Sequence, residues 1–163
     1  LLFAADRSFM LDGVMKEGDT PATVRLTSAN FGDYPMCNDL TRLQTRFLDD
    51  DASVEAAKAA IGKDLDAASV EELGLVTFIP DDIDWEDEVR VSIEQRVAMS
   101  PDSLTGMEAS LRFAGPETLE TKIFGRLSAW QNWIFQRPNA VGAEGALKLF
   151  GSGKRAGFDM NRV

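Results

Sequence analysis

The stretch Glu71-Glu72-Leu73-Gly74-Leu75-Val76 decides the fold that we predict for this chain. An alanine-rich helical segment leads into it, and a Gly that follows the last apolar residue of a helix is typical of a helix end. The apolar run 75–79, which Pro80 ends, then predicts a short buried strand. A helix, a glycine and a strand in immediate succession indicate an α/β core.

Outward from this joint, short strands and helices are predicted to alternate in the first half of the chain. Strands are predicted over 8–11 and 24–27, with helices over 39–47, 52–61 and 66–73. The acidic run 49–51 suits the start of a helix, and Gly62 suits the end of one.

The second half is predicted to be almost entirely helical. Asp84 is the predicted cap of a helix in which apolar residues recur every four positions, and Ser100-Pro101 is the predicted start of the next helix. Further helices are predicted over 116–136 and 144–150. We therefore expect three regions: the end of an α/β core over 1–83, a helical region over 84–150 and a polar tail over 151–163.

Composition excludes several classes of function. Acidic residues outnumber basic ones by 27 to 17, which gives a net charge of −10, and no basic stripe is present, so we expect no nucleic-acid partner. No apolar run approaches the roughly 18–20 residues that a membrane-spanning helix needs, so we expect no membrane partner either.

The absence of His and the presence of one Cys narrow the chemistry further. A chain without His has neither a Ser-His-Asp triad nor a His-ligated zinc or di-iron site, so we predict no metal. A single Cys, Cys37, cannot form an internal disulfide, and no secretory signal is evident, so we expect a cytoplasmic protein. Any catalysis must use carboxylates, hydroxyls, backbone N–H groups or a cofactor.

The turn Gly32-Asp33-Tyr34-Pro35, which leads into the predicted helix at Asp39, is the main candidate binding site. Such a turn would present backbone N–H groups at a helix N-terminus, where an anion or a polarised carbonyl binds favourably. The alternative is a structural turn with Asn38 or Asp39 as the helix N-cap.

Other candidates have stronger structural alternatives. A thiol at Cys37 near a helix N-terminus would be reactive, but without a His as base a buried, inert Cys is the better interpretation. The acidic run 81–88 lacks the ligand spacing of a calcium loop and fits a solvated helix start. Trp130 and Trp133 could form an aromatic ligand wall, although their helical spacing favours core or interface packing.

Several motifs in the first half resemble the enoyl-CoA hydratase/isomerase (crotonase) superfamily. Gly32-x-x-Pro35 followed by Leu40-Thr41-Arg42-Leu43 resembles the GxxPGxGGxxRL turn of that superfamily. The segments 67–76 and 2–7 are similar to its ELGLV landmark and to the end of its ELALACD helix. The resemblance implies an α/β crotonase-like fold, the ClpP/crotonase spiral, here truncated at the N-terminus.

The segments 102–109, 113–118 and 126–142 resemble more specifically a member of the superfamily that has two crotonase-like halves. That resemblance implies a lyase that hydrolytically opens the oxidised ring of an aromatic acyl-CoA and releases formate. It implies no separate cofactor, since CoA is part of the substrate, and it implies a homo-oligomer in which these helices also contact the N-terminal half.

The departures from the family pattern indicate that the catalytic groups lie elsewhere. Ser28 stands where the resemblance places a catalytic Glu, and Asn38-Asp39 replaces a Gly-Gly pair. The chain begins at Leu1 in mid-pattern, so we expect the catalytic carboxylates and the oxyanion hole upstream of it. We predict no catalytic residue here and assign substrate binding to Gly32, Asp33, Tyr34 and Pro35. The alternatives are a non-catalytic scaffold or oligomerisation module, or an enoyl-CoA hydratase-like enzyme.

Overall fold

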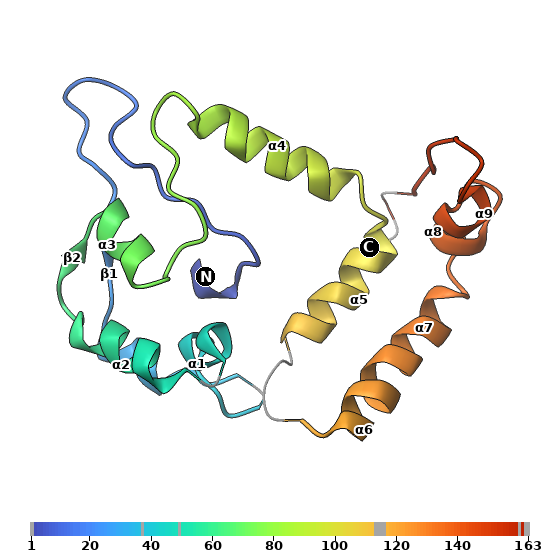
Figure 1. The fold of residues 1–163 in the computed structure, drawn as a ribbon, viewed down its shortest axis with the longest axis horizontal. Helices are drawn as coiled ribbons and strands as arrows, with labels where there is room; N and C mark the ends of the chain where they lie inside the picture. The colour runs from blue at the N-terminus through green and yellow to red at the C-terminus, as the bar shows by residue number, and fades with distance from the viewer. Residues whose placement is uncertain (1, 37, 49, 113–116, 160, 162–163) are drawn as a thin grey trace. The chain divides into compact units, whose positions relative to one another are not determined.

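The chain forms two compact units, unit 1 over Leu1–Ile93 and unit 2 over Glu94–Val163. A computed structural model describes residues 2–36, 38–48, 50–112, 117–159 and 161, with only the backbone of 111 and 112, and Figure 1 labels its α-helices and strands. Among these residues, every helix is too short or too polar to cross a membrane. The units divide within helix α4, Trp85–Val97, and the predicted three-region organisation stays a prediction.

Unit 1 combines short helices with one small antiparallel sheet. Strands β1 and β2 pair Val24 with Leu65 and Arg25 with Asp64. The elements that precede α4 are η1 (Leu2–Ala4), β1 (Val24–Arg25), η2 (Ser28–Phe31), α1 (Arg42–Phe47), α2 (Asp51–Ala59), β2 (Asp64–Leu65) and α3 (Ala67–Glu72). Short strands therefore do occur in the first half, as predicted.

The predicted joint at Gly74 is confirmed as a helix end. Helix α3 begins after Asp66, whose carboxylate accepts a hydrogen bond of 2.9 Å from the Ser69 N–H. At the other end Gly74 has φ +64°, its N–H donates to Glu71, and the Leu75 N–H donates to Val70. This pair of bonds is the Schellman arrangement that glycine allows.

The strands predicted over 8–11 and 75–79 are reduced to one parallel bridge between Phe9 and Phe78. The Met10 N–H donates to the Phe78 carbonyl at 3.0 Å, but the ladder is interrupted beside it. There the Ser8 N–H donates to the Thr77 Oγ1, and the Thr77 N–H donates to the Ser8 Oγ. Hydroxyl groups that bond to neighbouring backbone replace the regular ladder on one side of the bridge. On the other side Pro80 has no N–H to donate, although its carbonyl accepts from the Asp12 N–H at 2.9 Å, so both predicted strands stay short.

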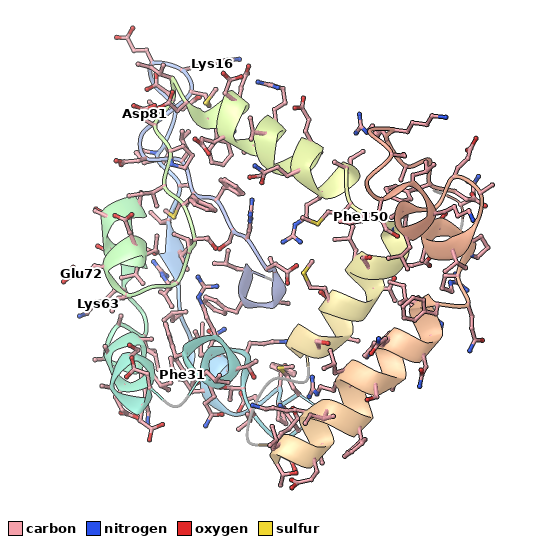
Figure 2. The ribbon with its side chains drawn as sticks, turned by 45° about the vertical axis from the view of Figure 1, so that its right-hand side comes forward. Lys16, Phe31, Lys63, Glu72, Asp81 and Phe150 are labelled. Atoms are coloured by element: carbon pink, nitrogen blue, oxygen red, sulfur yellow. The ribbon has the colours of Figure 1, made fainter. Side chains whose placement is uncertain are left out.

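The core of unit 1 includes side chains of α1, α3 and the segment after Gly74. Side chains from segments far apart in sequence meet here, and Leu26, Leu43, Val70 and Leu75 are fully buried. The whole cluster comprises Met10, Leu26, Leu43, Ala57, Ala60, Leu65, Ala67, Val70, Leu75 and Val76. By contrast, Lys63 and Glu72, labelled in Figure 2, are exposed.

The second half is helical, as predicted. Its elements after α4 are α5 (Pro101–Arg112), α6 (Leu119–Lys122), the π-helical turn η3 (Ile123–Leu127), α7 (Ser128–Ile134), α8 (Pro138–Val141) and α9 (Ala146–Leu149). The described part of the tail contains no helix or strand, but two of its N–H groups donate to residues earlier in unit 2: Gly157 to the Glu144 carbonyl and Asp159 to the Asn139 Oδ1.

The longest predicted helix, 116–136, differs from the observed one in three respects. Helical structure begins at Leu119, because the Thr118 hydroxyl caps it by accepting from the Thr121 N–H at 3.2 Å; Pro116 lies outside the described residues. A π-helical turn interrupts it around Gly125. Finally, the helix ends at Ile134, and Pro138 begins the separate helix α8, at a position where its missing N–H has no cost.

Candidate functional site

The predicted binding turn Gly32-Asp33-Tyr34-Pro35 is exposed on unit 1. It follows directly after η2, and Tyr34 keeps 77% of its surface exposed. Ser28, at the position of the family's catalytic Glu, is also exposed, as the first residue of η2. The assignment of these four residues to substrate binding stays a prediction.

The backbone that follows the turn is largely occupied by its own hydrogen bonds. The Met36 N–H donates to Leu40, the Leu40 N–H to the Asn38 Oδ1, and the Asp39 N–H to Met36. Asp39 itself has φ +61°, a left-handed conformation that an acidic residue tolerates better than most. Cys37 lies outside the described residues.

Helix α1 begins three residues later than predicted, because Thr41 caps it in place of Asn38 or Asp39. The Thr41 Oγ1 accepts from the Gln44 N–H at 3.1 Å, and the Gln44 Oε1 accepts from the Thr41 N–H at 2.8 Å. This reciprocal pair is a capping box, which uses two N–H groups that would otherwise be available to an anion.

Unit 2 contains a groove of about 610 Å³ that we did not predict from the sequence. Helices α5 and α7 supply most of its lining, which includes Met107, Trp130, Trp133 and Ile134. The indoles of Trp130 and Trp133 lie edge to face, with ring centroids 5.2 Å apart. A predominantly apolar groove of this size with a few polar groups is the usual form of a small-molecule site.

The polar part of this groove is built at the start of α5. Asp102, the second residue of the helix, is only 2% exposed, and its Oδ1 accepts a hydrogen bond of 3.0 Å from the Arg137 Nε. The Arg137 guanidinium also lies 4.8 Å from the centroid of the Trp133 ring, a cation–π contact. The positive end of the α5 dipole and the arginine together stabilise this buried negative charge.

Two polar atoms of the groove remain without a hydrogen-bond partner among the described residues. They are the Oδ2 of Asp102 and the Oγ of Ser100, the residue that precedes α5. A buried polar atom without a partner is destabilising by about 1–3 kcal/mol, so both atoms reduce the stability of the packing around the start of α5.

A second ion pair, between Arg126 and Glu117, involves another residue that lines the groove. The Arg126 Nε donates to the Glu117 carboxylate at 2.9 Å, and its Nη1 donates to the Ser110 carbonyl at 2.6 Å.

Within the described part of the chain, no group of three or more His, Cys, Asp or Glu side chains could hold a metal ion.

The sequence pointed to one part of this groove and gave no indication of the other. For Trp130 and Trp133 the helical spacing favours core or interface packing over an aromatic ligand wall, and both residues line the groove. The pairing of Asp102 with Arg137 was missed, because 35 residues separate them and no spacing rule joins the start of one helix to the end of another. The available signal was an acidic residue directly after a Ser-Pro helix start.

Comparison with known proteins gives one strong similarity. No protein-family model matches the chain. The benzoyl-CoA-dihydrodiol lyase of Aromatoleum evansii is 59% identical to this chain over all 163 residues, and the matched part is 29% of the length of that protein. The chain thus spans less than one third of its relative. The predicted resemblance to one individual lyase is confirmed: over its whole length the chain is similar to a part of benzoyl-CoA-dihydrodiol lyase.

Proposed function

We propose that this chain is part of a cytoplasmic lyase that acts on benzoyl-CoA dihydrodiol. The observation that carries the proposal is the 59% identity, which extends over every residue of the chain to a protein that bears that name. The reaction would be hydrolytic opening of the oxidised ring, with release of formate, from 2,3-epoxybenzoyl-CoA or from the dihydrodiol that addition of one water to the epoxide gives. CoA enters as part of the substrate, so the proposal needs no separate cofactor.

Within that enzyme, we assign this chain a structural role and a crotonase-like fold. Ser28 stands where the family pattern places a catalytic Glu, and the exposed turn at Gly32 is followed by a helix whose first N–H groups are occupied by a capping box. The carboxylates that manage water and protons would then come from residues outside this chain. The same Ser28 argues against an enoyl-CoA hydratase-like reaction.

A chimera tests the proposal most directly. The matching 29% of the Aromatoleum evansii lyase is replaced by this chain, and formate release is measured from 2,3-epoxybenzoyl-CoA. We expect the chimera to open the ring and the isolated 163-residue chain to be inactive. The same lyase with that part deleted is the control.

The proposed reaction and the proposed structural role can be contradicted by different outcomes. A chimera that is folded and inactive would contradict the assignment to this reaction. Ring opening by the isolated chain would instead contradict the structural role while leaving the reaction class in place.

The second candidate function is a packing or oligomerisation module without its own substrate. It is favoured by the apolar side chains that the helical run 119–135 exposes, among them Leu119, Phe124, Leu127 and Phe135. Exposed apolar surface of this kind marks interaction sites. Light scattering of the isolated chain tests this role, because self-association is expected and a stable monomer at all concentrations would contradict it.

A further inference from the structure

Unit 2 exposes many apolar side chains and buries few. Apart from Pro101, Ala140 is its only buried apolar residue among those whose side chains the structure describes, whereas the described part of unit 1 buries eleven. Eleven large apolar side chains in the described part of unit 2 are more than one third exposed, and Phe124 and Leu127 are 71% and 67% exposed. Since burial of apolar surface is the main favourable term in folding, a small unit of this kind is stabilised when a further surface covers it.

The groove of unit 2 lies within this apolar surface and has both a hollow and a projecting part. Its volume is about 610 Å³, and the half-buried indoles of Trp130 and Trp133 form part of its wall. Leu127 and Phe135 also line it, but more than half of each side chain is exposed, so both stand at its edge. One surface thus offers a hollow and the side chains that can fill the same hollow on a second copy, as a two-fold symmetric contact requires.

The distribution of charge favours a second copy at this surface. Unit 1 contains 20 acidic and 8 basic residues, and unit 2 contains 7 and 9, so their net charges are −12 and +2. Two copies of unit 1 would repel each other, whereas two copies of unit 2 are close to neutral.

The groove itself is also balanced in charge. Among the described lining residues the charged ones are Asp102 and Arg126, and each has a partner of opposite sign, Arg137 and Glu117. The segment 121–143, which supplies most of the aromatic lining, contains no acidic residue. A contact between two such surfaces therefore buries no unpaired carboxylate, the group whose burial would be most costly.

We propose that two copies of this chain associate through the groove of unit 2, with Leu127 and Phe135 of each copy against Trp130 and Trp133 of the other. Tryptophan, phenylalanine, methionine and arginine, which this lining contains, are the residue types enriched in protein interfaces. This association rests on the second candidate function, an oligomerisation module, and adds to it the surface and the partner. It does not depend on the proposed ring opening.

Sedimentation velocity of the 163-residue chain over a concentration series measures the dissociation constant of the dimer. Leu127→Asp and Phe135→Asp each place a carboxylate at the edge of the groove. Both are expected to raise the dissociation constant about tenfold or more, because that carboxylate would be buried without a partner. Both positions are more than half exposed in the single copy, so the variants should keep the circular dichroism spectrum of the natural chain.

Two matched controls add the same charge at exposed apolar positions outside the groove. Phe150, labelled in Figure 2, belongs to unit 2 and is 89% exposed, and Ile83 belongs to unit 1 and is 82% exposed. Phe150→Asp and Ile83→Asp should leave the dissociation constant nearly unchanged.

A second measurement locates the contact without mutation. The indole N–H signals of the three tryptophans are followed by ¹H–¹⁵N NMR while the natural chain is concentrated. We expect the Trp130 and Trp133 signals to shift with the dimer fraction. Trp85 does not line the groove, so its signal should stay in place.

The proposed contact is overturned if the chain dimerises while Leu127→Asp and Phe135→Asp keep the natural dissociation constant, or if Trp85 alone shifts. The oligomerisation role would then stand and the surface would be wrong. A chain that is monomeric at all concentrations overturns both, and it would mean that something other than a second copy covers the groove.

Discussion

At the residue scale, Gly74 combines two constraints that can be separated by mutation. Its φ of +64° lies in the left-handed region, and a Cβ built on it would stand 3.2 Å from the Phe47 ring. Gly62 shares the first constraint, with φ +80°, but has open space where its Cβ would be. Alanine substitutions at Gly62 and Gly74 can therefore be compared directly, since only the second adds a contact with Phe47.

Gly62→Ala is expected to reduce the free energy of unfolding by about 1–2 kcal/mol, the cost of a left-handed L-residue. Gly74→Ala should reduce it by more, because the Phe47 ring must also move. Urea unfolding followed by circular dichroism measures both values. An equal or smaller effect at Gly74 would show that the contact with Phe47 has no energetic consequence.

Arg46 also stabilises the helix end at Gly74, through a hydrogen bond from helix α1. The Arg46 Nε donates to the Gly74 carbonyl at 2.7 Å, and burial lowers the pKa of the Arg46 guanidinium. This bond satisfies a carbonyl at the end of α3 with a donor from α1, so the predicted joint depends on a residue 28 positions earlier in the chain.

At the element scale, acidic residues cap helices α2 and α3 and couple their stability to pH. The side-chain hydroxyl and the backbone N–H of Ser69 lower the pKa of Asp66 below its ordinary value of 3.8, and those of Ser53 do the same for Asp50. A carboxyl group with a depressed pKa in the folded state stabilises the fold above pH 3.8. That stabilisation is lost as the pH falls through the lower folded value.

Asp66→Asn should lessen this pH dependence without removing the cap, because asparagine caps about as well as aspartate and does not titrate. The urea midpoint of the variant should therefore fall less than that of the natural chain between about pH 5 and pH 2. Asp66→Ala, which has no cap at any pH, should be less stable already at pH 7. A parallel decline in Asp66→Asn and the natural chain would contradict the coupling.

Helix α4 shows how an element can be predicted while its surroundings are not. Its observed span, Trp85–Val97, follows directly after the predicted cap Asp84. The acidic first turn and the four-residue apolar spacing are local properties, and they are sufficient to form a helix. Yet Ile93 and Val97 are each 57% exposed, because periodicity indicates a potential contact face and says nothing of what covers it.

At the scale of the whole molecule, the buried apolar cluster lies in unit 1. Leu43 is completely buried there, whereas Ile83, in the same unit, is 82% exposed. Leu43→Ala should lower the free energy of unfolding by about 2–5 kcal/mol, since it leaves a cavity. Ile83→Ala should change it by no more than about 0.5 kcal/mol. Equilibrium unfolding in urea compares them, and similar losses would mean that the core is misplaced.

Unit 2 has buried polar side chains that form hydrogen bonds. Asp102 accepts from Arg137, and Asn139 accepts from the tail at Asp159. The tail, predicted as a polar region, is thus held by hydrogen bonds to residues elsewhere in the unit.

The sequence by itself determined which segments form helices and the helix end at Gly74, because these depend on neighbours within about one turn of chain. It did not determine every cap, since Thr41 and not Asn38 or Asp39 caps α1. It also determined the similarity to one lyase, since identical residues extend over the full chain. It did not predict the short bridge that replaced two strands, where Ser8 and Thr77 meet across 69 positions.

Only the tertiary structure decided where the groove lies and which of its residues are paired. Asp102 and Trp133 belong to different helices, and neither position indicates that Arg137 will bond to the carboxylate of one and stack on the ring of the other. Whether a polar atom is buried, paired or free depends on contacts between segments distant in sequence. Such contacts exist only once the chain has folded, which is why the unpaired oxygens of Asp102 and Ser100 could not be found from residue order alone.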